Sequence, residues 1–140
     1  MLRKIYLFIV IGFMFCAAAS ARAQNIRAHI PFDFYVNSKK LPAGDYSISR
    51  VSELNPDVLQ VRKRDGTAQS LIWVVRTDTP LRSKQNLLVF NRYGEDYFFS
   101  QIRVPSVINA EVRKSKTEIQ LAKNAAEMKR QKIALNSAKQ

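Results

Sequence analysis

The stretch VLQVRKRDGTAQSLIWVVRT, residues 58–77, decides the fold class of this chain. Two runs of β-branched and other apolar residues, 58–63 and 69–77, flank an Asp-Gly turn at 64–67. Asp-Gly pairs adopt the positive backbone angles of tight hairpins, so we predict two antiparallel strands here. The centre of the second run, 71–75, is apolar at every position, which predicts a central strand covered on both faces.

Further strand patterns precede this hairpin. Residues 26–36 alternate between two sets of side chains, one of them apolar throughout, which predicts a strand with one buried face. Pro31 lacks a backbone N–H for the ladder, so this strand should lie at a sheet edge or contain a bulge. A proline turn at 41–44 then leads into a strand at 45–51.

A second hairpin follows, with strands at 87–93 and 97–104. Six short strands with tight turns and no helical period between them predict a small antiparallel β-sandwich or barrel. This mainly β domain should cover residues 24–110. We expect four aromatic side chains to fill its core: Phe32, Phe34, Trp73 and Phe90.

The periodicity becomes helical after residue 110. The sequence SKTE, residues 115–118, fits a capping box, in which the serine and glutamate side chains each accept a hydrogen bond from a backbone N–H of the first turn. Apolar residues then recur at helical spacing, so we predict one helix from 116 to about 137. Residues 111–140 hold eight Lys or Arg and three Glu, which makes them a basic C-terminal helical tail. Its narrow apolar stripe should dock on the β domain or meet a partner.

The first 23 residues have the pattern of an export signal. Basic residues precede the mostly apolar run 5–19, and two overlapping Ala-x-Ala sites follow at 19–23. This order predicts a signal peptide, residues 1–23, with cleavage after Ala23. The alternative is an uncleaved membrane anchor, although the apolar run is shorter than the ~20 residues that span a bilayer. Lipid attachment at Cys16 is disfavoured because bulky residues precede this cysteine.

Removal of the signal leaves a basic chain without cysteine. Cys16 is the only cysteine, so the exported chain cannot form disulfides and must rely on packing. Three of the 23 Lys or Arg lie in the signal, whereas all 11 Asp or Glu follow it, so the exported chain remains strongly positive. Clustered positive charge attracts acidic polysaccharide, lipid headgroups or nucleic acid. The alternative is a solvated surface that only maintains solubility.

The sequence contains no evident catalytic constellation. The single histidine, His29, lies about 13 Å along an extended strand from Asp33, the nearest carboxylate on its face. A Gly-x-Ser-x-Gly motif is absent, so we expect His29 to be an ordinary surface residue. One histidine without cysteine disfavours a zinc or iron site, and the chain has no glycine-rich phosphate loop. We therefore expect no metal, no cofactor and no enzymatic activity.

Aromatic residues near a basic side chain form the candidate ligand site. Exposed rings beside cations bind sugars or bases in small barrels. On this basis we select Tyr35, Arg92, Tyr93 and Tyr97 as candidate ligand contacts, because tyrosine hydroxyls favour a boundary with water. The alternative is that these rings fill the core.

Three segments resemble a family of small uncharacterised exported bacterial proteins. They are IPFDF at 30–34 continuing through LPAGDY at 41–46, then FNRYG at 90–94, then YFFSQ at 97–101. The resemblance covers most of the exported domain, and such proteins often continue into a basic segment like VRKSKTE at 112–118. It implies export and a small β domain, and it supplies no activity, ligand or site residue.

The sequence supports one leading functional hypothesis and two alternatives. The leading hypothesis is an exported, non-catalytic β domain, periplasmic or extracellular, that binds a partner or an anionic envelope polymer through its basic tail. The first alternative is a small hydrolase of an envelope or extracellular polymer that uses carboxylates such as Asp33 and Glu95. The second is an anion-binding module for acidic polysaccharide or, less favoured, nucleic acid. We expect no transmembrane segment in the mature chain.

Export predicts a defined N-terminus. Expression of the full chain in a bacterium should yield a periplasmic or secreted protein that begins at Gln24. Intact-mass spectrometry distinguishes this start from Arg22, the product of the upstream Ala-x-Ala site. A mass that retains the first 23 residues would instead identify the apolar run as a membrane anchor.

Overall fold

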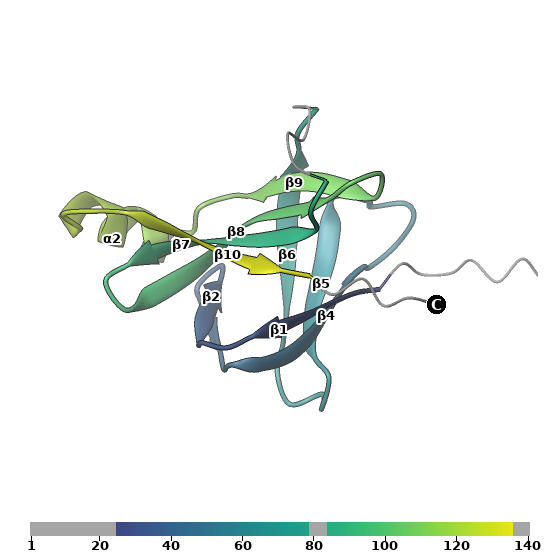
Figure 1. The fold of residues 1–140 in the computed structure, drawn as a ribbon, viewed down its shortest axis with the longest axis horizontal. Helices are drawn as coiled ribbons and strands as arrows, with labels where there is room; N and C mark the ends of the chain where they lie inside the picture. The colour runs from purple at the N-terminus through teal and green to yellow at the C-terminus, as the bar shows by residue number, and fades with distance from the viewer. Residues whose placement is uncertain (1–24, 79–83, 136–140) are drawn as a thin grey trace, which may run out of the picture.

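The computed structural model describes residues 25–78 and 84–135 of the 140-residue chain. These residues form ten strands and one helix (Figure 1). In chain order they are β1 (Ile26–Ile30), β2 (Phe34–Val36), β3 (Lys39–Leu41), β4 (Gly44–Arg50), β5 (Val58–Lys63), β6 (Gln69–Arg76), β7 (Leu87–Tyr93), β8 (Asp96–Val104), β9 (Ile108–Val112), α2 (Lys116–Asn124) and β10 (Lys129–Ala134). The predicted mainly β fold with a C-terminal helix is confirmed. The predicted signal peptide and its cleavage site at Ala23 lie outside the described residues.

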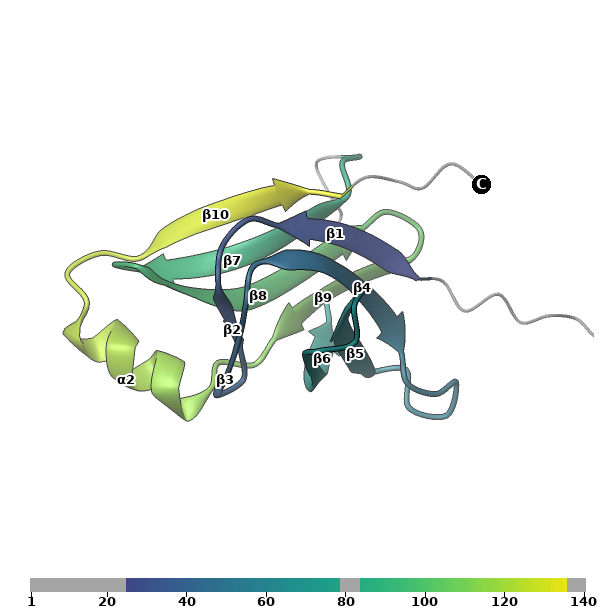
Figure 2. The same cartoon turned by 90° about the horizontal axis from the view of Figure 1, so that it is seen from below.

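The strands form one strongly curled sheet. Its hydrogen-bonded order runs β1-β4-β5-β6-β9-β8 and continues from β8 to the short β2–β3 hairpin. β8 also pairs with β7, and β7 pairs in turn with β10. The pairs are antiparallel except for the contact between β2 and β8. β10 contacts β1, so the two ends of the sheet approach each other (Figure 2). The curled sheet therefore encloses one core.

Aromatic rings and aliphatic side chains from most strands meet in this core. Its largest fully buried members include Ile30, Phe34, Tyr46, Ile72 and Phe90. The Phe34 ring packs edge to face on Tyr46 and on Phe90, with ring centroids 5.1 and 5.4 Å apart. The predicted burial of Phe34 and Phe90 is confirmed, and Phe32 is half-buried against Phe90.

The strand predicted over 26–36 is in fact two strands separated by a corner at Pro31. Its apolar positions are buried on both sides of the corner, so the predicted facing of the side chains is confirmed. β1 is an end strand of the sheet, as the proline predicts. Asp33 stabilises the corner, because its carboxylate accepts a hydrogen bond from the Ala43 backbone N–H at 2.9 Å.

The sequence does not predict three of the strands, β3, β9 and β10. β3 contains two exposed lysines, and it follows a tight turn in which Asn37 has a φ of 57°. β9 follows a turn in which Ser106 has a φ of 63°. β3 and β10 contain few apolar residues, so their period-two pattern is weak and pairing with a neighbour decides their conformation. β9 does alternate, with Ile108 and Ala110 buried, but it is only five residues long.

The prediction of a single helix from 116 to about 137 is wrong beyond residue 124. α2 ends at Asn124, and the chain then forms β10, which pairs antiparallel with β7. Ile133 packs against the core from β10, and Leu135 just beyond it is buried there. The strand satisfies the backbone groups along the free edge of β7, which a helix cannot do. Residues 111–135 of the basic tail are therefore part of the folded domain. No helix within residues 25–78 and 84–135 combines the length and apolarity required to cross a membrane.

The prediction that Trp73 fills the core is also wrong. β6 directs Ile72 and Val74 inward and Leu71, Trp73 and Val75 outward, and the Trp73 side chain is 65% exposed. The strand is central in the sheet, as predicted, but only one of its faces is covered.

The folded state of the C-terminal segment can be tested at Leu135. Leu135→Ala should lower the free energy of unfolding by about 2 kcal/mol or more, because the truncation leaves a cavity in the core. Met128→Ala is the matched control, since Met128 is exposed before β10, and it should cost less than about 0.5 kcal/mol. Urea denaturation followed by circular dichroism measures both. Equal small effects would contradict the docking of this segment on the core.

Candidate functional site

The four candidate ligand contacts lie on two faces of the sheet around the β7–β8 hairpin. Arg92 and Tyr97 are paired across this hairpin, and the Arg92 guanidinium lies 5.3 Å from the centre of the Tyr97 ring. The Tyr97 ring also stacks on Phe32, with ring centroids 3.9 Å apart. Arg92 donates hydrogen bonds to the Gly94 carbonyl and to the Glu95 carboxylate. The structure therefore brings Arg92 and Tyr97 together, with both side chains engaged in internal contacts.

Tyr35 and Tyr93 lie on the opposite face, around Phe98. The Tyr35 ring stacks on Phe98 at a centroid distance of 4.7 Å, and the Tyr93 ring meets Phe98 edge to face at 5.8 Å. Tyr93 is buried, whereas Tyr35 is half-buried with the Lys40 ammonium 5.8 Å from its ring centre. The four selected residues are thus divided between two aromatic clusters.

A buried carboxylate from α2 organises this second face. Glu118 is only 3% exposed, and its carboxylate accepts hydrogen bonds from Asn91 Nδ2 at 2.8 Å and from the Tyr93 hydroxyl at 3.2 Å. Ser115 caps the helix, as predicted, by accepting the Glu118 backbone N–H at 3.1 Å. The Glu118 side chain is directed at β7, so the second half of the predicted capping box gives way to a tertiary contact.

Burial raises the pKa of the Tyr93 hydroxyl, and the negative charge of Glu118 raises that pKa further. Tyr93 therefore stays protonated at neutral pH and can donate to Glu118. Asn91 Oδ1 is buried without a hydrogen-bond partner. The hydrogen bonds to Glu118 must offset this unsatisfied acceptor as well as the desolvation of the carboxylate. The cluster is consequently a costly arrangement that fixes α2 on the sheet.

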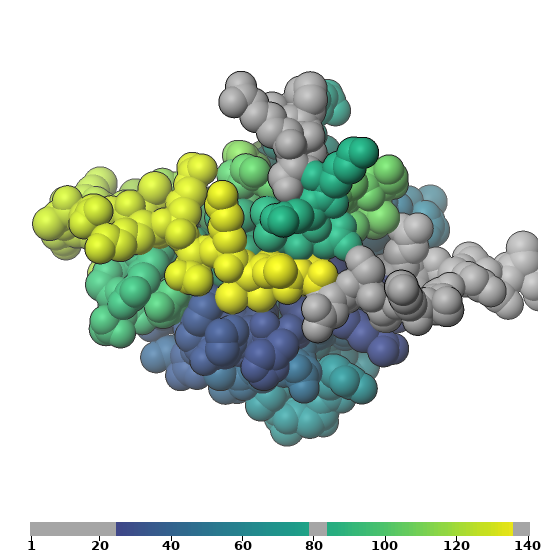
Figure 3. Space-filling model, viewed as in Figure 1, coloured from purple at the N-terminus to yellow at the C-terminus, as the bar shows by residue number. Residues whose placement is uncertain are grey.

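The segment that Glu118 fixes presents a basic surface. Seven of its side chains are exposed cations: Arg113, Lys114, Lys116, Lys123, Lys129, Arg130 and Lys132. Two glutamates lie within residues 113–132. Glu118 is buried, and Glu127 lies 3.7 Å from Lys129 and offsets one of these cations. Figure 3 shows the C-terminal part of this segment in yellow, lying across the surface of the β domain.

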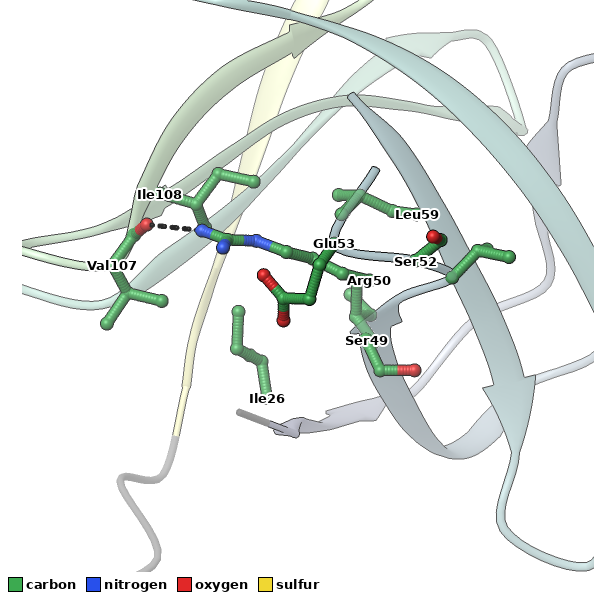
Figure 4. A pocket seen from close by; sticks show the side chains of 10 residues that line it. Ile26, Ser49, Arg50, Ser52, Glu53, Leu59, Val107 and Ile108 are labelled. Atoms are coloured by element: carbon green, nitrogen blue, oxygen red, sulfur yellow. Dashed lines mark hydrogen bonds between the residues drawn. The ribbon is translucent and has the colours of Figure 1, made fainter. Parts of the chain in front are cut away.

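A pocket opens at one end of the curled sheet (Figure 4). It has a volume of about 420 Å³, within the range of small-molecule sites. Apolar side chains from four strands line it: Ile26, Ile48, Leu59 and Ile108. Arg50 and Glu53 add opposite charges, and the Arg50 guanidinium donates to the Val107 carbonyl at 3.4 Å. Residues 48–53, at the end of β4 and in the loop after it, form one side of the pocket, and the other lining residues come from distant parts of the sequence, so no local motif predicts it.

His29 has a partner that spacing along one strand cannot reveal. The register of β1 and β4 places His29 opposite Asp45, and His29 Nδ1 lies 2.8 Å from Asp45 Oδ1. Both side chains are more than half exposed, so His29 is a surface residue. Within the described residues, no group of three or more His, Cys, Asp or Glu is placed to hold a metal ion.

Comparison of the chain with protein-family models, with curated proteins and with solved structures gives no match. The geometry alone defines the class of protein. It is a small, mainly antiparallel β domain with a basic C-terminal segment folded onto it and a pocket at one end of its sheet.

The buried cluster predicts a stability effect at Glu118. Glu118→Ala should cost about 1–3 kcal/mol, because it leaves the donors of Asn91 and Tyr93 buried without their acceptor. Glu127→Ala, which removes an exposed glutamate from the same segment, should cost less than about 0.5 kcal/mol. Chemical denaturation at neutral pH compares the two. A Glu118→Ala variant as stable as Glu127→Ala would contradict the role assigned to this carboxylate.

Proposed function

We propose that this protein is an exported, non-catalytic β domain that contacts an anionic envelope polymer through its basic C-terminal segment, residues 113–132. The observation that carries the proposal is the exposure of seven cations on a segment that is itself fixed to the domain. A fixed array of cations loses less conformational entropy on binding than a flexible tail does. Export rests on the sequence pattern of residues 1–23 and on the family resemblance, both of which remain predictions.

The β10 strand places part of this charge on one face. Arg130 is paired with Asn91 and Lys132 with Val89, and both partners on β7 are buried. Asn91 is also the residue that binds Glu118, so the beginning of α2 and the outward cations of β10 meet at the same part of β7. Lys116 begins α2, two residues before Glu118. Lys116, Arg130 and Lys132 are therefore the residues to test first.

The hydrolase alternative gains no support from the two carboxylates selected for it. Asp33 accepts the Ala43 backbone N–H and lies 4.0 Å from Lys40, so it has a structural role at the corner after β1. Glu95 is almost fully exposed and pairs with Arg92. A general acid or base must lie within hydrogen-bond reach of a bound substrate, and neither carboxylate is among the residues that line the pocket at the end of the sheet.

Charge removal tests the proposed contact surface. The triple variant Lys116→Gln, Arg130→Gln and Lys132→Gln should bind polygalacturonate, an acidic polysaccharide, about tenfold or more weakly than the unaltered protein. The control triple Arg27→Gln, Arg64→Gln and Lys84→Gln removes the same charge from exposed positions outside the segment and should retain most of the affinity. Binding of the unaltered protein should also weaken steeply as salt rises.

Phosphatidylglycerol vesicles, measured in parallel, separate a lipid headgroup from a polysaccharide as the source of anions. Equal losses of affinity in the two triple variants would contradict the proposal, because the basic segment would then contribute only through the net charge of the protein. Binding that is insensitive to salt would contradict an electrostatic contact altogether.

A further inference from the structure

The pocket at one end of the curled sheet contains an arginine that the alternation of β4 directs into it. Tyr46 and Ile48 of this strand are buried, and Arg50, its last residue, has the same parity. The Arg50 side chain therefore continues the inward face of β4 beyond the end of the core. In the sheet β5 and β6 separate β4 from β9, so the contact of Arg50 with the Val107 carbonyl, just before β9, spans the pocket (Figure 4).

The guanidinium of Arg50 is weakly engaged in this contact. Its hydrogen bond to the Val107 carbonyl is 3.4 Å long, whereas such bonds are usually about 2.9 Å. An arginine has five N–H donors in a planar fork, which matches the two oxygens of a carboxylate. Arg50 therefore retains donors for an anionic group inside the pocket.

A carboxylate of opposite charge lines the same pocket from the loop after β4. Glu53 has no hydrogen-bond or ion-pair partner among the described residues, and Figure 4 shows it in the pocket beside Arg50 without a hydrogen bond between the two. These two are the charged residues of the described lining. An adjoining hollow adds Asp78 and Arg76, of which Arg76 is paired with another carboxylate at 3.1 Å. The pocket thus has one positive and one negative group that do not neutralise each other.

The other lining side chains are mostly apolar. Ile48, Leu59 and Ile108 are 1%, 2% and 6% exposed, so the core itself forms part of the wall. Ile26 and Val51 add apolar surface that is more open to water. An apolar group that enters the pocket is removed from water against these side chains, which favours binding.

We propose that this pocket binds a small zwitterion with an apolar body, the chemical class of a free apolar amino acid. Arg50 binds the carboxylate of the ligand, Glu53 accepts hydrogen bonds from its ammonium group, and its apolar side chain lies against Ile48, Leu59 and Ile108. An anion without an ammonium group leaves Glu53 as an uncompensated like charge, and a cation without a carboxylate does the same with Arg50. A zwitterion satisfies both groups.

The net charge of the protein predicts the opposite preference. With a formal net charge of +12, the full chain attracts an anion more strongly than a zwitterion at any surface without a local carboxylate. Preference for the zwitterion over its matching anion is therefore specific to Glu53. The described lining includes no residue of the basic segment 113–132, so the pocket and the proposed polymer contact are independent, and either can be wrong without the other.

Isothermal titration calorimetry of the protein purified after expression of the full chain tests the site. Leucine should bind saturably below about 10 mM. It should bind about fivefold or more tightly than isocaproate, which is leucine without its amino group, and isoamylamine, which is leucine without its carboxylate. Glycine, a zwitterion without an apolar body, should bind about tenfold or more weakly than leucine.

Phenylalanine repeats the comparison with a larger apolar body, against hydrocinnamate and phenethylamine as its matching anion and cation. Absence of saturable binding by both amino acids would overturn the proposal. An anion or a cation that binds as tightly as its parent amino acid would overturn it as well, because one of the two charged groups would then have no role.

Two substitutions assign the charged groups of the ligand to their partners. Glu53→Gln should weaken leucine binding about tenfold and remove the preference for leucine over isocaproate, because the ammonium group loses its acceptor. Arg50→Gln should instead remove the preference for leucine over isoamylamine. The controls Glu95→Gln and Arg64→Gln remove the same charges at exposed positions outside the pocket and should leave leucine binding unchanged. Circular dichroism verifies the fold of each variant, and equal losses in pocket and control variants would overturn the proposal.

Nuclear magnetic resonance locates the ligand without any substitution. Leucine should shift the backbone amide signals of Ile26, Ile48, Glu53 and Ile108 most strongly, because these residues line the pocket from separate parts of the chain. The signals of β10 should stay in place. Shifts that are largest outside the pocket, for example around Tyr97, would overturn this site and assign the amino acid to another surface.

Discussion

β7 is buried on both faces, and the remainder of the fold depends on the elements that bury it. Its inward side chains enter the core. Its outward side includes a buried polar residue, Asn91, whose side-chain amide needs a hydrogen-bond partner because water does not reach it. Glu118 supplies that partner and thereby fixes the first turn of α2 on the sheet. The chain leaving α2 then pairs with the free edge of β7 as β10. One strand thus accounts for the position of the whole C-terminal segment, including its cations.

Local patterns predicted the parts of the fold that local interactions decide. The limits of β5 and β7 coincide with the predicted runs, because each is an apolar run next to a hairpin turn. The helix start at Ser115 was also predictable from its cap. The end of that helix was not, because apolar residues at 128 and 135 fit a helical stripe as well as a route into the core. Only the unpaired edge of β7, a non-local feature, favours the strand.

The candidate site was less predictable, since its residues meet through pairing of distant strands. A tyrosine near a cation gives the same sequence pattern whether its ring is buried, as Tyr93 is against Phe98, or faces water. The same ambiguity affected Trp73, whose apolar neighbours suggested a covered strand. β6 and β7 have similar sequences in this respect, but α2 returns over β7 and leaves β6 exposed on its outer face. The path of the rest of the chain, and not the sequence of the strand itself, decides which apolar strand is covered on its outer face.

The basic segment offers dispersed charge, with Ile119 and Met128 as its large exposed apolar residues, which favours fast, salt-sensitive attraction to a polyanion. Its cations lie on a helix and a strand that contacts with β7 hold in place, so several of them approach a polymer together. Once one cation has bound, the next binds at a high effective concentration. Weak individual attraction by exposed lysines and arginines then becomes retention on a polymer, without any deep binding site on the domain.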